Sequence, residues 1–216
     1  MTADRFQRQA DLVPRAGIES VTATVIGVGA VGRQVALQLA SIGIRKLQLI
    51  DFDQVELTNV TTQGYRLDQI GRAKTAATAA DAKAIDPKIE VNAIADRYRP
   101  HFKTGEAVIA CVDSINARAA IWRSIQARCS VWIDGRMRGE VIRVLASDNP
   151  RRDSDYGKTL FDPSEAHAGS CTSSSTVYAA SLAASLTVHQ FTRWLREIPV
   201  ERDVSVNLLA SEMVSS

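Results

Sequence analysis

The stretch TATVIGVGAVGRQVALQLASIGIRKLQLIDFD, residues 22–53, decides how the rest of the chain is interpreted. An apolar run leads into a glycine-rich segment at residues 27–32, a helical pattern follows, and a second apolar run ends at Asp51. This order predicts a strand, a glycine turn, a helix and a strand that ends at an acid. Glycines there let backbone N–H groups approach a phosphate, and the acid accepts hydrogen bonds from a ribose. We therefore predict nucleotide binding; the alternative is a turn that needs glycine only for packing.

Composition and charge argue against several other classes of protein. The 216 residues, 45% of them hydrophobic, suit one domain, and the net charge of +2 argues against direct nucleic-acid binding. The polar start and the lack of an apolar run of about 18 residues lead us to expect no signal peptide and no membrane partner. Three cysteines, without a C-x-x-C pair, favour a cytoplasmic protein without disulfides or structural zinc.

The remaining sequence continues to alternate between strand and helix patterns. Strands are predicted over residues 89–94, 107–112, 131–134, 141–146 and 204–209, and helices over residues 71–85, 115–128 and 176–196. We expect a short helical arm that Pro14 and Gly17 interrupt, and a long polar connection over residues 54–70. The predicted fold class is α/β: a doubly wound, Rossmann-like and mostly parallel sheet, with helices on both faces and C-terminal antiparallel strands.

Charged residues are expected to converge at the carboxyl ends of these strands, where such sheets bind ligands. Asp51 and Asp53 end the second strand, Asp113 follows the run over residues 107–112, and Lys74 begins a helix. A dinucleotide needs neither Lys74 nor Asp113, whereas a triphosphate is neutralised by a lysine and by Mg²⁺ that one or two carboxylate oxygens hold. The set favours ATP and Mg²⁺ over NAD. The alternatives are a helix cap for Asp113 and a solvated surface for Lys74 and Asp53.

Six motifs occur in one order between residues 5 and 114, within a likeness that covers about residues 5–196. They are Arg5-Phe6-Gln7-Arg8-Gln9, the glycine turn, Asp51-Phe52-Asp53, Thr58-Asn59 with Gln63, Gly71-x-x-Lys74 and Cys111-Val112-Asp113-Ser114. This arrangement resembles the ubiquitin-activating (E1-like) superfamily and, within it, the bacterial ThiF/MoeB-type adenylyltransferases. The resemblance implies a homodimer that uses Mg-ATP to adenylate the C-terminal carboxylate of a ubiquitin-like or sulfur-carrier protein ending in Gly-Gly, with release of pyrophosphate.

The resemblance also implies roles for the matched residues. Asp51 would hold the ribose, Lys74 would stabilise the α-phosphate region, Asp113 would hold Mg²⁺, and Arg8 would reach the ATP of the partner subunit. Attack of a carboxylate on phosphorus needs positioning and charge neutralisation rather than a general base, because a carboxylate is already ionised near pH 7. The expected nucleotide-binding residues are Gly27, Gly29, Ala30, Gly32, Asp51, Asp53, Asn59, Gln63, Lys74 and Ser114.

Cys171 precedes the last predicted helix, and its position resembles that of the sulfur-carrying cysteine of thiamine-pathway relatives. A nearby helix N-terminus would favour the thiolate; the alternative is a loop residue without chemistry. Cys111 and Cys129 are interpreted as packing residues. One departure concerns Thr62, which stands where relatives commonly carry an arginine. One of Arg66, Arg72, Arg136 or Arg138 would replace it, and the sequence leaves the choice among them open.

The sequence thus indicates one adenylation domain over residues 1–216, with an N-terminal arm over residues 1–20 and the Cys171 loop over residues 147–175. Three other functions stay open. One is an E1-like enzyme that adenylates a small carboxylate or a tRNA-linked substrate. Another is a non-enzymatic nucleotide-binding dimer module, which Thr62 favours. The third is an NAD-dependent oxidoreductase, for which His167 and His189 are the only candidates for proton transfer in the C-terminal part.

Overall fold

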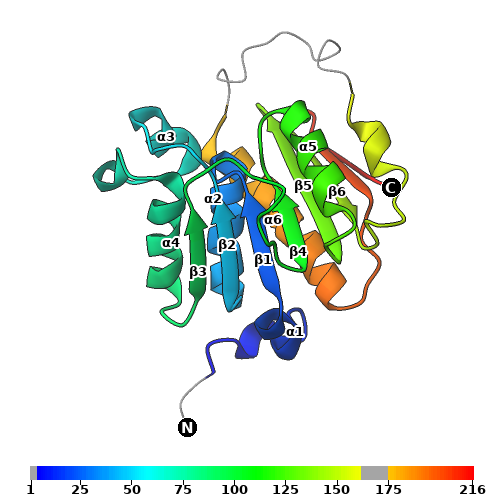
Figure 1. Cartoon of the computed structure of the whole chain (residues 1–216), viewed down its shortest axis with the longest axis horizontal. Helices are drawn as coiled ribbons and strands as arrows, with labels where there is room; N and C mark the ends of the chain where they lie inside the picture. Colours follow the sequence, from blue (N-terminus) through cyan, green and yellow to red (C-terminus); the bar gives the residue numbers. More distant parts are fainter. Residues whose placement is uncertain (1–3, 162–174) are drawn as a thin grey trace.

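A computed structural model of the chain describes residues 4–161 and 175–216. Within these residues, eight strands form one sheet in the order β3-β2-β1-β4-β5-β6-β7-β8 (Figure 1). The strands are β1 (Thr22–Ile26), β2 (Lys46–Ile50), β3 (Glu90–Ile94), β4 (Ala107–Ala110), β5 (Val131–Arg138), β6 (Val141–Ser147), β7 (Asp203–Asn207) and β8 (Glu212–Ser215). Neighbours from β3 to β5 are parallel and those from β5 to β8 are antiparallel, which confirms the predicted fold class.

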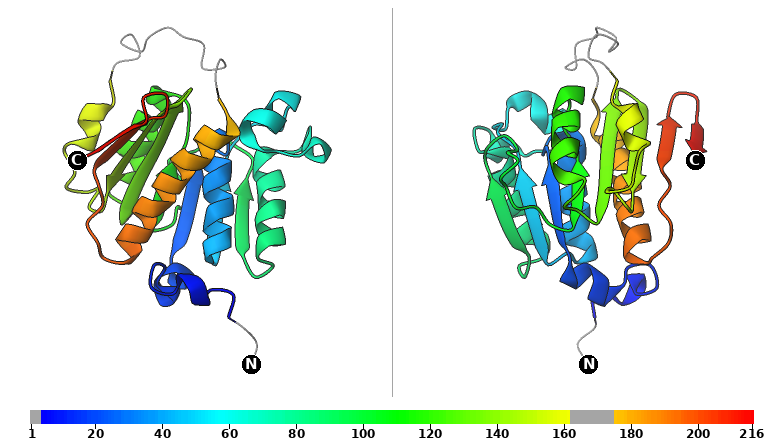
Figure 2. Two further views of the ribbon diagram at one scale, coloured as in Figure 1. Left: turned by 180° about the vertical axis from the view of Figure 1, so that it is seen from behind. Right: turned by 45° about the vertical axis from the view of Figure 1, so that its right-hand side comes forward.

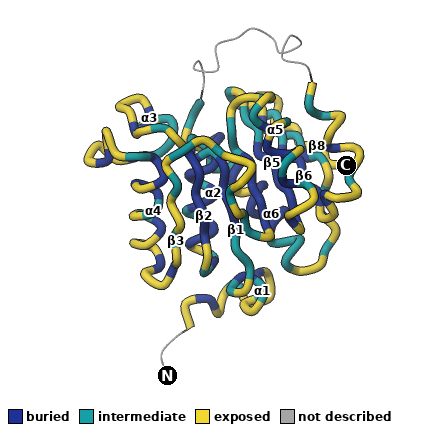
Figure 3. The backbone as a smooth tube through the Cα atoms, viewed as in Figure 1, coloured by how far each residue is buried: buried dark blue, intermediate teal, exposed yellow. Residues whose placement is uncertain are grey.

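Helices cover both faces of the sheet, as Figure 2 shows from two further sides. On one face lie α2 (Ala30–Ile42), α4 (Lys74–Ile85) and α6 (Val177–Leu195); on the other lie α5 (Ile115–Ile125) and the 3-10 helix η3 (Tyr156–Thr159). The central strands β1, β2, β4 and β5 are buried between these layers (Figure 3). The second layer is anchored by Trp122, Trp132 and Tyr156, whose ring centroids lie 4.5 to 5.4 Å apart.

The parallel strands end at one edge of the sheet, and the N-terminal arm lies at the other. The arm comprises the 3-10 helix η1 (Gln7–Gln9) and α1 (Arg15–Ser20). We expected Pro14 and Gly17 to interrupt this helical arm, and the structure corrects this in part: Pro14 is the N-cap of α1 and Gly17 lies inside it. A proline fits a helix start, because the first helical N–H groups have no intrahelical partner.

The expected long connection over residues 54–70 contains two helices, α3 (Leu57–Gln63) and the 3-10 helix η2 (Leu67–Gln69). Helix α3 is short and polar, so it shows no apolar periodicity, and a capping box between Glu56 and Asn59 stabilises its start. It ends at Gly64, whose φ is +77°. The connection is therefore an ordered part of the carboxyl edge, which is the side of the sheet where the parallel strands β1 to β5 end.

Other elements also differ from the prediction: β4 ends at Ala110 rather than at residue 112, and α5 ends at Ile125 rather than at residue 128. Helix α4 begins at Lys74 rather than at Gly71, which adopts a φ of +83°. Strands β5 and β6 extend toward each other and form a hairpin that pairs Arg138 with Val141. Strand β8 was not expected, because it is an exposed edge strand without a buried alternation.

Candidate functional site

The glycine turn after β1 allows close packing at two positions and leaves open space at a third. Gly27 has a φ of +87°, and a Cβ atom there would lie 2.8 Å from the backbone of Cys111. A Cβ atom at Gly32 would lie 1.8 Å from the carbonyl oxygen of Gly27. At Gly29 the nearest atom within 4 Å is Gln63 Oε1, at 4.0 Å. Among residues 4–161 and 175–216, Gly29 is therefore the glycine of this turn that leaves room for a ligand to approach the backbone.

Helix α2 starts directly at this turn. Ala30 is its first residue, and the N-cap Gly29 supplies no side-chain hydrogen bond. The first N–H groups of a helix have no partner within the helix, and the helix dipole places partial positive charge there. The open space at Gly29 and this helix start together fit a bound phosphate.

Asp51 is fixed beside the turn by two backbone groups. The N–H of Val28 donates to Oδ2 over 2.6 Å, and the N–H of Asp53 donates to Oδ1 over 2.8 Å. Burial raises the pKa of Asp51, whereas these two hydrogen bonds lower it. Tyr65, which the sequence did not single out, donates its hydroxyl to the carbonyl of Val28 over 2.7 Å. Asp51 and Tyr65 thus hold the turn in place, and the two backbone N–H groups orient Asp51, the acid expected to bind the ribose.

Lys74 lies at the same edge and is buried with only 7% of its surface exposed. Its Nζ is 3.0 Å from Oδ2 of Asp53, whose side chain is 45% exposed. The solvated helix surface considered for Lys74 is therefore wrong. The Lys74 side chain, paired with one half-exposed carboxylate, thus lies near Asp51, the acid that contacts the glycine turn.

The structure brings Asn59 and Gln63 to this edge in different ways. Asn59 is buried, and its Oδ1 accepts a hydrogen bond of 2.9 Å from the N–H of Glu56. Gln63 Oε1 is buried without a hydrogen-bond partner in the part of the chain that the structure describes. This atom faces Gly29, so a polar group is available beside the open part of the turn.

The bend after Gln63 is held by Arg33, a second residue that the sequence analysis missed. Its guanidinium donates to the carbonyl of Gly64 over 2.9 Å and to Asp81 over 2.7 Å, and it lies 4.2 Å from the ring centroid of Tyr65. A charged residue within the apolar start of a helix is the signal that marks it in the sequence. Arg33 is a support of the site, since its nitrogens are already bonded.

Asp113 lies beside the turn because the end of β4 runs under it: the N–H of Cys111 donates to the carbonyl of Ile26 over 2.7 Å. The helix cap considered for Asp113 is wrong, because Ser114 caps α5 and accepts a hydrogen bond of 3.4 Å from Ala117. Asp113 is exposed. Its carboxylate suits Mg²⁺, which takes one or two carboxylates and completes its shell with water and phosphates.

Arg8 lies at the opposite end of the sheet from these residues. The arm packs where α2 ends: Gln9 donates to the carbonyl of Ile42 over 2.7 Å, and the ring of Phe6 lies against Gly43. Arg8 is exposed and does not belong to the site of its own chain. Its contact with a partner subunit stays a prediction.

Thr62 does not supply a charge, and its hydroxyl donates to the carbonyl of Thr58 over 2.8 Å. Two of its four possible replacements are engaged elsewhere, Arg66 with Asp68 and Asp81, and Arg136 with Asp134. Arg72 and Arg138 are exposed, and neither forms an ion pair among residues 4–161 and 175–216.

Two of the cysteines, Cys111 and Cys129, are the packing residues that the sequence indicated. Cys111 and Cys129 are free thiols, and burial raises the pKa of each to about 12. Neither is therefore a thiolate at neutral pH, and both serve packing. Cys171 lies outside the described residues.

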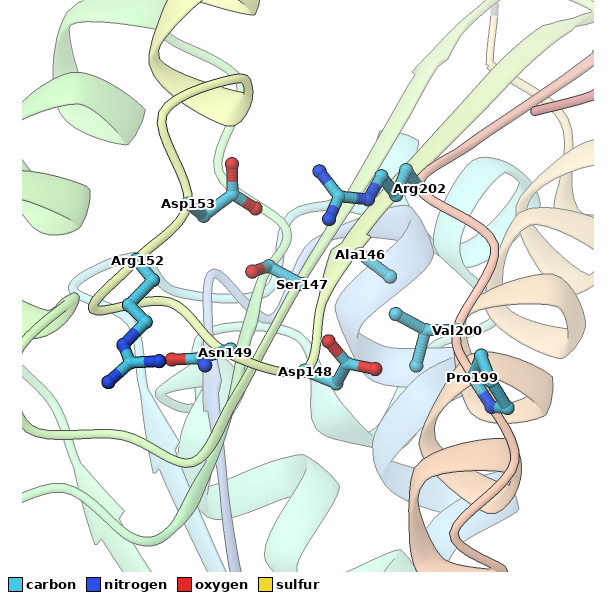
Figure 4. Close-up of a pocket in the computed structure, with 9 residues that line it drawn as sticks. All are labelled: Ala146, Ser147, Asp148, Asn149, Arg152, Asp153, Pro199, Val200 and Arg202. Carbon is cyan, nitrogen blue, oxygen red and sulfur yellow. The ribbon is translucent and has the colours of Figure 1, made fainter.

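A cavity of about 240 Å³ occurs elsewhere in the molecule, lined by Ser147, Asp148, Arg152 and Arg202 among others (Figure 4). Ser147 pairs with Trp132 near the start of β5, so this cavity lies at the end of the sheet opposite the glycine turn. Acidic and basic side chains alternate around it, and it contains none of the residues expected to bind the nucleotide.

In the described part of the chain, no helix is long and apolar enough to cross a membrane.

The fold and the carboxyl edge define a Rossmann-like α/β domain with a buried lysine and an extra aspartate beside its glycine turn. The sequence pattern of the ThiF family matches residues 6–213, and the chain belongs to this family. The resemblance to the E1-like superfamily is thereby confirmed.

Relatives of similar sequence are named ubiquitin-like modifier-activating enzyme 5. The protein from Drosophila sechellia is 32% identical over 134 residues, which cover 54% of this chain and 33% of the relative. That from Bombyx mori is 35% identical over 120 residues, covering 48% of this chain and 30% of the relative. The chain thus spans about a third of the length of the curated relatives it matches.

Two solved structures share the fold at low sequence identity. E. coli MccB with ATP has a TM-score of 0.78 and 16% identity, covering 100% of this chain and 72% of that chain. PaaA has a TM-score of 0.80 and 20% identity, covering 98% of this chain and 72% of that chain.

Proposed function

We propose that this chain is an ATP-dependent adenylyltransferase that activates the C-terminal carboxylate of a ubiquitin-like or sulfur-carrier protein ending in Gly-Gly. A carboxylate oxygen would attack the α-phosphorus of ATP, the bond to the β-phosphate would break, and pyrophosphate would leave. The protein would act as a homodimer in the cytoplasm, with residues 1–216 as one adenylation domain, the arm over residues 1–20 and the loop over residues 147–175 that carries Cys171.

The observation that carries this proposal is the buried Lys74 beside Asp53, next to the open turn at Gly29. A hydride-transfer enzyme has no need of a cation there, whereas attack of one anion on another does. Lys74 would neutralise the charge that moves onto the departing pyrophosphate. The backbone N–H groups at the start of α2 would hold the phosphates, and Asp51 would hold the ribose. The first steps toward the reaction are therefore binding and orientation by fixed groups.

Asp113 would hold Mg²⁺, which would supply positive charge to neutralise phosphate oxygens when it is bound. The other expected contacts come from Asn59 and Gln63. Arg8 of a partner subunit would add a second cation. The thiolate of Cys171 would then attack the acyl carbon of the adenylate, so that a thioester forms and AMP leaves.

The relatives named ubiquitin-like modifier-activating enzyme 5 support a ubiquitin-like protein as the partner. MccB has been crystallised with the peptide MccA, which makes a small carboxylate or peptide the principal alternative substrate. A carrier protein is preferred here because the sequence likeness, at 32% over 134 residues, lies with the modifier-activating enzymes.

ATP–pyrophosphate exchange tests the proposal directly. The intact protein is incubated with ATP, Mg²⁺, labelled pyrophosphate and carriers ending in Gly-Gly, and incorporation of label into ATP is expected only with a cognate carrier. Lys74→Ala should lower the exchange rate by about 100- to 1,000-fold. Lys83→Ala is the matched control, because Lys83 lies exposed on the last turn of the same helix.

Other outcomes point to other functions. ATP binding without exchange for any carrier or peptide would contradict the enzyme and favour a binding module. Exchange that occurs with a peptide but with no carrier protein would indicate that the substrate is a peptide. Preference for NAD over ATP would exclude adenylation.

A further inference from the structure

A buried carboxylate in β5 lies between two arginines and a tyrosine. Asp134 has no exposed surface. Its Oδ2 is 2.7 Å from Arg136 Nε and accepts a hydrogen bond of 2.9 Å from the hydroxyl of Tyr156, and its Oδ1 forms an ion pair with Arg118. An apolar residue at such a position is often at least as stable as a buried ion pair, because removing charges from water costs several kcal/mol. Packing alone therefore does not explain why charged residues occupy this position.

One side of this network reaches residues 112–114, the Asp113 turn. Arg118 lies on α5 and is buried, and it donates to the carbonyl of Val112, the residue directly before Asp113. It also lies 3.4 Å from the carbonyl of Gly135. Burial lowers the pKa of Arg118 to about 10, so it is charged at neutral pH. Asp134 holds Arg118, and Arg118 holds the Asp113 turn.

The other side holds η3 against the sheet. Arg136 donates to the carbonyl and to the hydroxyl of Thr159 over 3.1 and 3.0 Å. Tyr156 donates to Asp134 and packs against Trp122, with ring centroids 4.5 Å apart. Two segments far apart in the chain, the Asp113 turn and η3, are thus fixed by one carboxylate.

We propose that Asp134 is a positioning residue that sets the Asp113 turn and η3 in one fixed arrangement for Mg-ATP binding. This inference rests on the proposed function, in which Asp113 holds Mg²⁺. Asp134 itself contacts neither the metal nor the nucleotide, because it is fully enclosed. It acts through Arg118, whose planar guanidinium forms an ion pair with the carboxylate and donates a hydrogen bond to the Val112 carbonyl.

The test is Asp134→Asn in the intact chain, since asparagine keeps the shape and removes the charge. Binding of a non-hydrolysable ATP analogue is measured with and without Mg²⁺. We expect the Mg²⁺-supported affinity to fall about 10- to 100-fold, as for other residues that orient metal ligands, and the Mg²⁺-free affinity to change much less. Amide hydrogen exchange should become faster at residues 112–114 and at residues 156–160 together.

The matched control is Asp203→Asn. Asp203 also pairs with an arginine of the sheet, since Arg143 Nε and Nη2 lie 3.0 and 2.6 Å from its two oxygens. It joins β6 and β7 away from Asp113. Its loss should leave the Mg²⁺ dependence and both segments unchanged.

An unchanged Mg²⁺ dependence in Asp134→Asn, or faster exchange in only one of the two segments, would overturn the inference. If that variant does not fold, Tyr156→Phe removes one hydrogen bond and keeps every charge; it should then loosen both segments by a few-fold, and loosening of residues 156–160 alone would overturn the inference. If the wild-type chain binds no Mg-ATP at all, the proposed function fails. Hydrogen exchange still tells whether Asp134 couples the two segments.

Discussion

The backbone N–H of Val28 donates a hydrogen bond of 2.6 Å to the carboxylate of Asp51. The carbonyl of the same residue accepts a hydrogen bond of 2.7 Å from Tyr65. The middle of the glycine turn is therefore fixed from two sides before any ligand binds. A fixed turn loses little conformational entropy on binding, which is the advantage of a preorganised site.

Alanine substitutions at Gly29 and at Gly32 should have different effects, because Gly29 faces the expected ligand site and Gly32 packs against the backbone of Gly27. Gly29→Ala should fold, because a Cβ atom there meets only Gln63 Oε1, at 4.0 Å, yet it should weaken ATP binding at least about tenfold by filling the approach to the phosphate. Gly32→Ala should destabilise the protein by more than about 4 kcal/mol, because the methyl group overlaps the Gly27 carbonyl. Thermal unfolding and ATP titration measure the two effects. Unimpaired ATP binding by Gly29→Ala would contradict the phosphate site.

Asp51→Asn should change how stability depends on pH. Burial raises the pKa of Asp51 above its ordinary value of 3.8. As pH rises from about 4, the acid therefore ionises first in the unfolded chain, which lowers the free energy of unfolding of the wild type. The variant lacks this loss, so its stability relative to wild type should increase with pH up to the folded-state pKa. Urea unfolding at several pH values measures the difference, and a difference that falls with pH would contradict the assignment.

The strands and long helices could be predicted because their burial leaves a pattern. Strands β1, β2 and β4 are buried along nearly their whole length, and mainly apolar runs identify them, although Thr24 lies in β1 and Gln48 in β2. Helix α3 and strand β8 leave no such pattern, since the first is polar and the second is exposed. Periodicity fails where an element does not contribute a face to the core.

The site was predictable only where a residue type suggests its chemistry. Lys74 and Asp51 were found because they follow recognisable motifs, and the structure buries both at one edge. Tyr65, Arg33 and Asp134 act by holding backbone or other side chains, and their partners lie up to 48 residues away in the sequence. Spacing along one chain cannot reveal such long-range contacts.

Thiol labelling at pH 8 should separate the cysteines. Burial raises the pKa of Cys111 and Cys129 to about 12, so only about one in ten thousand of each is a thiolate at that pH. The folded Cys171→Ser variant should react very slowly with iodoacetamide and should react at both remaining thiols after denaturation. Rapid labelling of the folded variant would contradict the burial of Cys111 and Cys129. For the proposed role of Cys171, the variant should keep ATP–pyrophosphate exchange and lose the thioester.

Adjacent substitutions at Asp113 and Ser114 should have opposite effects on activity and stability. Ser114 caps α5 through a long hydrogen bond of 3.4 Å to Ala117, so Ser114→Ala should cost about 0.5–1 kcal/mol of stability and leave the Mg²⁺ dependence of exchange unchanged. Asp113→Asn removes an exposed charge that does not cap the helix. It should therefore keep the unfolding temperature while raising the Mg²⁺ concentration needed for exchange about tenfold or more. Mg²⁺ titration of exchange and thermal unfolding of both variants measure this contrast. Loss of exchange in Ser114→Ala at unchanged stability would show that the serine acts as a nucleotide ligand, as the resemblance implies, and not only as a cap.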